Sequence, residues 1–198
     1  DPMIGNSLVA NAKTLTVASG AVLRLYTCTL IVNANLQVSG RVELLQSGSL
    51  LRVLGNVAWE NGSSLYSPGS STLECHGNWN FASGCIFMPS GGTVHLLSGR
   101  DTYIQDHSLS TRFHNLVINK QDGKTVSFLG SSTQDLKIVN CLTFQAGYLG
   151  SSSGRTIILE GQLVSTGGGC KLDSGTFRLT GAGTTLSAST GSWFQNLE

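Results

Sequence analysis

A four-residue phrase recurs along the chain and limits its fold more than any other feature. A threonine is followed by an apolar residue, a variable residue and a second apolar residue at Thr72–Cys75, Thr93–Leu96, Thr156–Leu159 and Thr176–Leu179. Within the first pair of copies and within the last pair the interval is about 20 residues, and glycine follows each copy closely. Apolar residues at every second position indicate a β-strand with one buried side.

A second phrase recurs with nearly the same spacing. The segment Gly55–Gly62 (GNVAWENG) aligns with Gly77–Gly84 (GNWNFASG), and Leu142–Gly147 aligns with Leu163–Gly168. Asn56 thereby falls on Asn78, which predicts a stacked pair of amides at a corner. Repetition at a fixed period of this length is typical of solenoids.

These patterns predict an all-β fold, a right-handed parallel β-helix with about 20–22 residues per coil. One coil cannot bury its own inward side chains, but coils stacked about 4.8 Å apart close a continuous core. Variable coil length favours the right-handed form over the left-handed form, whose repeat is strict. We expect a single domain over residues 1–198, with irregular loops near 101–111 and 121–135, where the spacing lengthens. A β-sandwich is the alternative, although its strands would need no constant recurrence.

A longer repeat overlies the first. RFHNL at Arg112–Leu116 returns as WFQNL at Trp193–Leu197, after about four of the shorter intervals. The chain ends inside this second copy, so we expect it to be a fragment of a longer protein whose adjoining repeats cover its end coils.

The order GTVHLLSG, FHNLVINK, KTVSFLG, LKIVNCLTFQAGYL and RTIILEG resembles the repeat arrays of large secreted bacterial surface proteins. The resemblance covers Gly92–Leu197 and, less clearly, the half before it. It implies a secreted or cell-surface protein that acts as a stalk, adhesin or carbohydrate-contacting scaffold, and it carries over no catalytic residues. The five cysteines and three tryptophans depart from those arrays.

Composition excludes several classes of function. The net charge of +1 and the 12% charged content argue against electrostatic binding of nucleic acid or of an anionic membrane. No apolar run approaches the roughly 18 residues of a spanning helix, so we expect no membrane insertion. The five cysteines form no CxxC pair, which disfavours zinc, and we interpret most of them as small core residues.

The outward positions of the threonine phrase, with two weaker copies included, are predicted to share one external face. They are mixed in kind, which disfavours both a stack of acids and a uniform threonine face: Thr16, Glu74, His95, Ser127, Ile158 and Arg178.

The strongest concentration of metal-ligating residue types is Asp101, Asp106, His107 and His114, which we interpret as a solvated polar loop. We therefore predict no catalytic residue, no cofactor and no bound metal. The alternative is a polysaccharide lyase or glycosidase, which commonly needs two carboxylates about 5 to 9.5 Å apart, or a carbohydrate-binding module.

Alternation with Val57 and Phe81 places Trp59 and Trp79 in the core. The remaining large aromatic side chains are candidates for an exposed carbohydrate-contacting surface: Tyr26, Tyr66, Tyr103, Tyr148 and Trp193. The sequence thus predicts a non-catalytic structural or adhesive module whose partner is an extracellular glycan or a surface or matrix protein.

Overall fold

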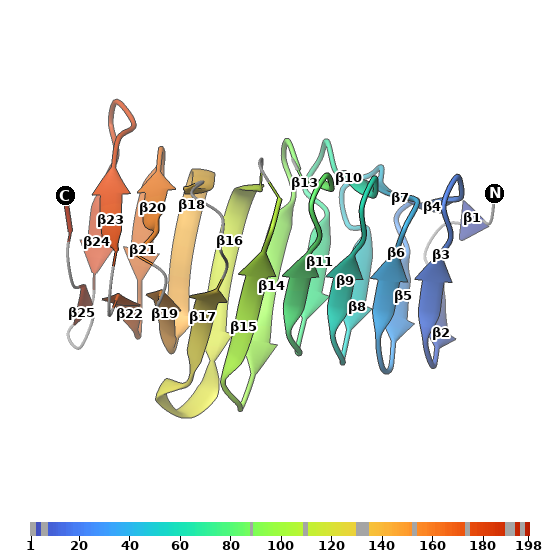
Figure 1. The fold of residues 1–198 in the computed structure, drawn as a ribbon, viewed down its shortest axis with the longest axis horizontal. Helices are drawn as coiled ribbons and strands as arrows, with labels where there is room; N and C mark the ends of the chain where they lie inside the picture. The colour runs from blue at the N-terminus through green and yellow to red at the C-terminus, as the bar shows by residue number, and fades with distance from the viewer. Residues whose placement is uncertain are drawn as a thin grey trace.

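The chain winds into a single stack of coils with its two ends at opposite ends of the long axis (Figure 1). The structure is a computed structural model that describes residues 3–4, 8–87, 89–108, 111–129, 135–151, 154–172, 175–188, 193–194 and 197–198. Every pairing between its named strands is parallel, and the one helix in this part of the chain is the 3-10 turn η1 (Gln121–Gly123). The predicted parallel β-helix is confirmed.

The strands form three parallel sheets, named A, B and C. Sheet A contains β1 (Met3–Ile4), β4 (Val22–Leu25), β7 (Arg41–Leu44), β10 (Ser64–Tyr66) and β13 (Ile86–Phe87). Sheet B contains β2 (Val9–Ala12), β5 (Thr29–Val32), β8 (Leu50–Val53), β11 (Thr72–Cys75), β14 (Thr93–Ser98), β16 (Arg112–Lys120), β18 (Leu136–Ala146), β20 (Thr156–Leu159), β21 (Gln162–Ser165), β23 (Thr176–Leu179) and β24 (Leu186–Ala188). Sheet C contains β3 (Leu15–Val17), β6 (Leu36–Val38), β9 (Val57–Trp59), β12 (Trp79–Phe81), β15 (Thr102–Asp106), β17 (Thr125–Leu129), β19 (Tyr148–Ser151), β22 (Gly169–Leu172) and β25 (Trp193–Phe194).

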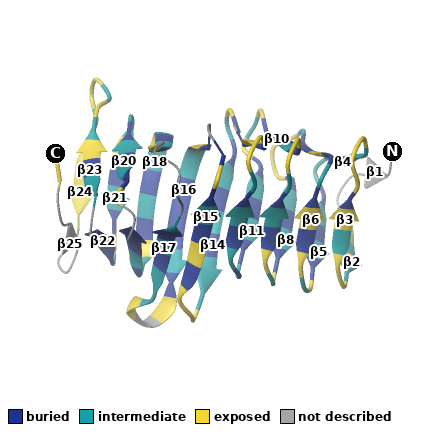
Figure 2. Ribbon diagram, viewed as in Figure 1, coloured by how far each residue is buried: buried dark blue, intermediate teal, exposed yellow. Residues whose placement is uncertain are grey.

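The register of the sheets follows the offsets seen in the sequence. Val57 lies beside Trp79, and Ile157 lies beside Phe177, each one coil apart. Buried and outward positions alternate along the strands (Figure 2). Each apolar pair of a coil therefore closes the layer of the coil beneath it, which is how a winding of about 21 residues acquires a core.

The core is filled by aromatic rings in successive layers. The rings of Trp59 and Trp79 are stacked with centroids 6.3 Å apart, and the ring of Phe87 meets both of them edge-on. Both tryptophans are at most 1% exposed, as predicted. Four of the five free cysteines are also buried in the interior, while Cys141 is partly exposed on sheet B.

Sheet A ends at β13, and its place in the coil passes to the first halves of long strands in sheet B. The ring of Phe113, near the start of β16, lies 5.3 Å from that of Phe87 and continues the stack. The register between β16 and β18 shifts after Phe113, where β18 has one extra residue, and β18 pairs with β20 through its first half and with β21 through its second. The corner between two faces is thus replaced by a bend within one strand.

The prediction that the outward residues of the threonine phrases share one face is wrong. Thr16 and Ser127 belong to sheet C, whereas Glu74 and His95 are neighbours in the middle of sheet B. Ile158 and Arg178 are neighbours on β20 and β23, and β20 pairs with the first half of β18. The phrase encodes strand alternation, and the same alternation is needed on every side of the coil.

The predicted loops near 101–111 and 121–135 are also corrected. Thr102–Asp106 and Thr125–Leu129 are the regular strands β15 and β17 of sheet C. The extra residues lie in the corners before these strands. Residues 109–110 and 130–134 fall outside the described part of the chain.

The longer repeat recurs in the structure at one of its positions. Leu116 pairs with Val94, and Leu197 forms a bridge to Phe177, the matching position of the later threonine phrase. The phenylalanines of the repeat do not correspond, because one lies in β16 of sheet B and the other in β25 of sheet C.

Asparagine side chains tie the corner before sheet C to the coil above. The Oδ1 atoms of Asn35, Asn56 and Asn78 accept hydrogen bonds from the backbone N–H groups of Asn56, Asn78 and Tyr103, at 2.9, 2.9 and 3.2 Å. The predicted pair of Asn56 and Asn78 is confirmed. The row of hydrogen bonds extends by one coil on each side, to Asn35 and to the backbone of Tyr103. Glycine precedes two of these asparagines because the corners approach closely: a Cβ on Gly77 would lie 2.3 Å from the carbonyl oxygen of Gly55.

We expect Asn56→Ala to lower the free energy of unfolding by about 1 kcal/mol, because the N–H of Asn78 loses its acceptor. Urea denaturation measures this change. Asn33→Ala is the control, since it removes an exposed 3.3 Å bond to the carbonyl of Ala12, and its effect should stay below about 0.5 kcal/mol. Equal losses in the two variants would contradict the role of the asparagine ladder.

Candidate functional site

The corner between sheets B and C is longest in two consecutive coils. Three residues separate the paired core positions Cys75 and Trp79, whereas seven separate their partners Leu96 and Ile104 in the next coil. In the coil after that, nine residues separate Ile118 from Phe128. The two long corners, residues 97–101 and 119–124, project beyond their neighbours in Figure 1, and we call them the lobe.

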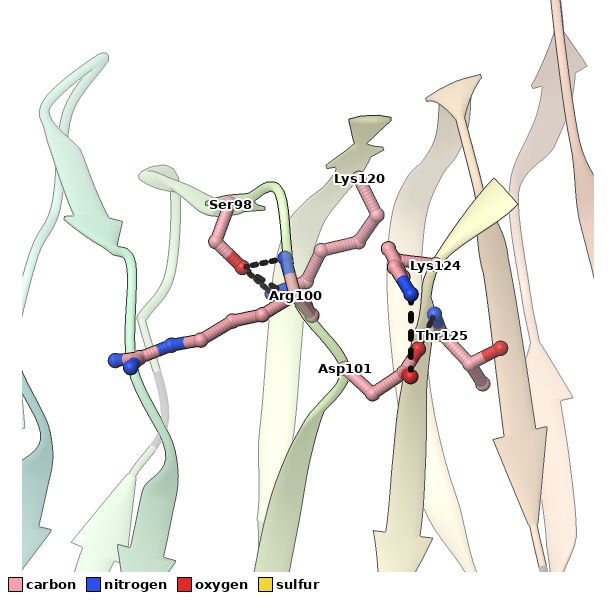
Figure 3. Close-up of polar contacts among 6 residues, drawn as sticks. All are labelled: Ser98, Arg100, Asp101, Lys120, Lys124 and Thr125. Atoms are coloured by element: carbon pink, nitrogen blue, oxygen red, sulfur yellow. Dashed lines mark hydrogen bonds and ion pairs between the residues drawn. The ribbon is translucent and has the colours of Figure 1, made fainter. Parts of the chain in front are cut away.

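The inside of the lobe is filled by Lys120. Leu116, Ile118 and Lys120 point inward along β16, and Lys120 has no exposed surface. Its Nζ donates to the carbonyl oxygen of Leu97 at 3.0 Å and to Oγ of Ser98 at 2.9 Å (Figure 3). Burial lowers the pKa of Lys120 to about 8.

Ser98 holds the first long corner in a strained turn. Its φ of 149° lies in a region that favours glycine. Its Oγ accepts from Lys120 and donates to the carbonyl oxygen of Arg100 at 3.0 Å. The hydroxyl and the buried amine together fix the turn from inside.

Asp101 replaces the asparagine ladder at the lobe. Its Oδ1 accepts the backbone N–H of Thr125 at 2.8 Å, and its Oδ2 lies 3.8 Å from Nζ of Lys124. Both charged side chains are largely exposed. The Arg100 side chain extends away from Lys124 toward the N-terminal coils (Figure 3). Asp101 therefore has a structural role, because its carboxylate holds the backbone at the start of β17.

Next to the lobe, one row of outward positions runs across four coils of sheet C. Tyr103, Ser127, Gly150 and Lys171 are successive cross-strand neighbours. The buried Gly150 adds no side chain to this row, and Nζ of Lys171 lies 3.5 Å from the ring centroid of Tyr148. We call the outward residues of this region the lobe face: Arg100, Asp101, Tyr103, Lys124, Thr125, Ser127, Tyr148 and Lys171.

A shallow hollow of about 290 Å³ lies on the sheet B side of the lobe, lined by Arg52, Leu54, Glu74, His76 and Leu97. It forms at the step where β14 continues past the end of β11. Arg52 and Glu74 form an ion pair, and burial lowers the pKa of His76. The neutral pair and the two leucines leave little net charge in the hollow.

The structure does not bring together the four residues of metal-ligating type, Asp101, Asp106, His107 and His114. Asp106 is inward and 1% exposed, so the solvated-loop interpretation is wrong for it. It accepts hydrogen bonds from the N–H of Ser108 at 2.8 Å and from Thr111, and it pairs with the buried Arg155 at 3.5 Å. His107 is exposed beside Gln105. Among the described residues no three His, Cys, Asp or Glu side chains are grouped as metal ligands would be.

Most carboxylates in the described part of the chain face a cation. Beyond Asp101 and Asp106, the ion pairs are Glu43 with Arg24 and Arg41, Glu74 with Arg52, Glu160 with Lys137, and Glu198 with Arg178. The hydrogen bond from Lys137 lowers the pKa of Glu160. A neighbouring cation favours the ionised carboxylate, whereas a general acid of a glycosidase needs a raised pKa.

The aromatic candidates lie on different faces. Tyr66 is 42% exposed on sheet A, beneath the guanidinium of Arg41, and Tyr103 is 37% exposed on sheet C. Tyr148 is partly covered by Lys171, and Tyr26 is partly buried. The side chain of Trp193 falls outside the described residues. The predicted exposure of Tyr103 is confirmed, its contact with carbohydrate stays a prediction, and the sequence could not assign it to the lobe face.

Sequence reasoning missed Lys120 and Arg155 because inward charged residues look like loop residues. The alternation of Leu116, Ile118 and Lys120 was the available signal for the first. For the second, no pattern in the sequence joins it to Asp106, which lies 49 residues earlier.

No family model matches the chain, and searches of curated proteins and of solved structures find no significant match. Within the described residues, no helix has the length and apolar character needed to cross a membrane.

We expect Lys120 to give the protein a distinctive dependence of stability on pH. Its folded pKa of about 8 lies below its ordinary value of 10.5, so the unfolded chain binds more protons between these values and this contribution to stability rises with pH. Burial also raises the pKa of Cys75 to about 12 and of Cys85 to about 11, which opposes this trend above about pH 9. The difference in free energy of unfolding between wild type and Lys120→Met removes the cysteine contribution, because both proteins contain the same cysteines.

Urea denaturation at pH 7, 8, 9 and 10 measures that difference. Wild type should gain stability relative to Lys120→Met as the pH rises. Lys124→Met, which changes a largely exposed lysine, should show no such trend. If the difference in stability between wild type and Lys120→Met did not change with pH, the lowered pKa of the buried Lys120 amine would be contradicted.

Proposed function

We propose that the chain is a non-catalytic β-helix module of a secreted or cell-surface protein and that its lobe face contacts an extracellular glycan. The proposal depends on one observation: the lobe face carries an exposed tyrosine, Tyr103, together with cationic side chains. The extracellular setting follows from the resemblance to secreted surface repeats.

Tyr103 is suited to hold a sugar ring. Its aromatic side chain offers a large, amphipathic surface with few rotatable bonds. The backbone N–H of Tyr103 is bound by Asn78, and Thr102 and Ile104 on either side are buried. The backbone that carries the ring is therefore held in place, so that binding orders little of the main chain.

The rest of the lobe face supplies hydrogen-bonding groups along the axis of the stack. Ser127 and Lys171 lie one and three coils beyond Tyr103 in the same row, a span of about 14 Å. Gly150 keeps the row low between them. An extended polymer lying along the stack axis would contact all of these residues.

The pairing of the carboxylates supports a non-catalytic role. Glu74 has Arg52 and His95 as its cross-strand neighbours, and Glu43 has Arg24 and Tyr66. Each of these acids forms an ion pair with an arginine, an arrangement suited to stabilising a surface. Polysaccharide hydrolysis instead needs an acid and a base facing one bond.

Glycan arrays followed by calorimetry test the proposal. We expect Tyr103→Ala to weaken glycan binding about tenfold or more, as expected for an aromatic anchor at the centre of a contact. Tyr66→Ala is the matched control, because it removes a tyrosine of similar exposure from sheet A and should leave the affinity unchanged.

Two results would contradict the proposal. One is the absence of binding to any neutral or acidic glycan on the array. The other is the release of new reducing ends or unsaturated products from a bound polysaccharide, which would make the module an enzyme.

A further inference from the structure

We infer that the ligand of the lobe face is an anionic polysaccharide, one that carries carboxylate or sulfate groups. This inference rests on the proposed function and names the chemical class of its glycan.

The distribution of formal charge carries the inference. The lobe, residues 97–101 and 119–124, holds three cations, Arg100, Lys120 and Lys124, against the two acids Asp101 and Asp122, a net charge of +1. The whole chain also has a net charge of +1, so the positive and negative charges outside the lobe balance. A local excess of one sign attracts ligands of the opposite sign.

The surface cations of the lobe are available to a ligand. Lys124 and Asp101 are 3.8 Å apart with side chains 40% and 66% exposed, and such surface pairs contribute at most about 1 kcal/mol. Asp101 keeps its hydrogen bond from Thr125 when Lys124 turns away. Lys124 can therefore exchange one carboxylate for another at little cost.

Arg100 is the second available cation. It is exposed, and its guanidinium forms no ion pair with any residue in the described part of the chain. Arginine binds carboxylates and sulfates through two parallel N–H donors. Arg100 and Lys124 lie on consecutive coils, and the Arg100 side chain extends away from Lys124, so the two can bind acidic groups of different sugars along one polymer.

The sheet B hollow makes a useful contrast. Its Arg52 is already paired with Glu74, and leucines form much of the rest of its lining. The cation of the hollow is thus already paired, whereas Arg100 and Lys124 of the lobe face are open to an anion.

Calorimetry with three oligosaccharides of similar length tests the inference: an oligogalacturonate, a chondroitin sulfate oligosaccharide and a neutral cello-oligosaccharide. We expect at least one acidic ligand to bind ten times more tightly than the neutral one in 50 mM NaCl. We also expect that affinity to fall several-fold in 300 mM NaCl, because salt screens exposed charges. Because chondroitin sulfate carries carboxylates and sulfates and oligogalacturonate carries carboxylates alone, the two acidic arms show whether sulfate is needed.

The decisive variant is Arg100→Gln combined with Lys124→Gln. It should lose tenfold or more in affinity for the acidic ligand and keep its affinity for a neutral one. The control is Lys13→Gln combined with Arg112→Gln, which removes two exposed positive charges outside the lobe and should stay within twofold of wild type. Thermal melts verify that each variant is folded.

The outcomes separate this inference from the proposed function. Equal binding of neutral and acidic ligands would overturn the anionic class while leaving glycan binding in place. An equal loss in both double variants would overturn the assignment to Arg100 and Lys124. Failure of all three ligands, with no hit on the array, would overturn the proposed function and this inference together.

Discussion

The structure depends on parallel hydrogen bonding between successive windings of one chain. A coil of about 21 residues has too little interior to fold alone, but the coil above it supplies both the missing backbone partners and the lid of its apolar layer. The inward positions are therefore occupied almost without a break, from Val17 through Trp59 and Phe128 to Phe177. Outward positions are free of this constraint, so the surface can vary while the register is kept.

The lobe illustrates what happens when a coil is lengthened under this constraint. Additional residues widen one corner and open an interior space that the apolar layers do not fill. A long side chain, Lys120, fills the space and uses its amine to bind a carbonyl and a hydroxyl of the preceding coil. Asp101 supplies the acceptor that asparagines supply at narrow corners. The projection that exposes Tyr103 and Arg100 is thus held by polar contacts inside and beneath it.

Much of the fold could be predicted from the sequence because the markers of stacking are local. The alignment of Asn56 with Asn78 fixed the register there, since a side-chain amide at a tight glycine corner recurs only where corners are superposed. The assignment of faces failed because alternation is the same on every sheet: Thr16 and Glu74 have similar neighbours in sequence but lie on sheets C and B. Polar residues at inward positions were the other source of error. Asp106 was interpreted as a loop residue because its partner, Arg155, comes two coils later.

The change of register at the lobe is the most direct test of this account. Asn80 pairs with Gln105, although a coil of constant length would place it beside Asp101. With Cys141 replaced by serine, cysteines can be placed at 80 and 105, or at 80 and 101, and oxidised under mild conditions. Neighbouring parallel strands bring Cα atoms within reach of a disulfide, and positions four residues along the strand are displaced by about 13 Å. The account predicts rapid cross-linking of 80 with 105 and none of 80 with 101; the reverse result would contradict the stacked coils and the lobe built on them.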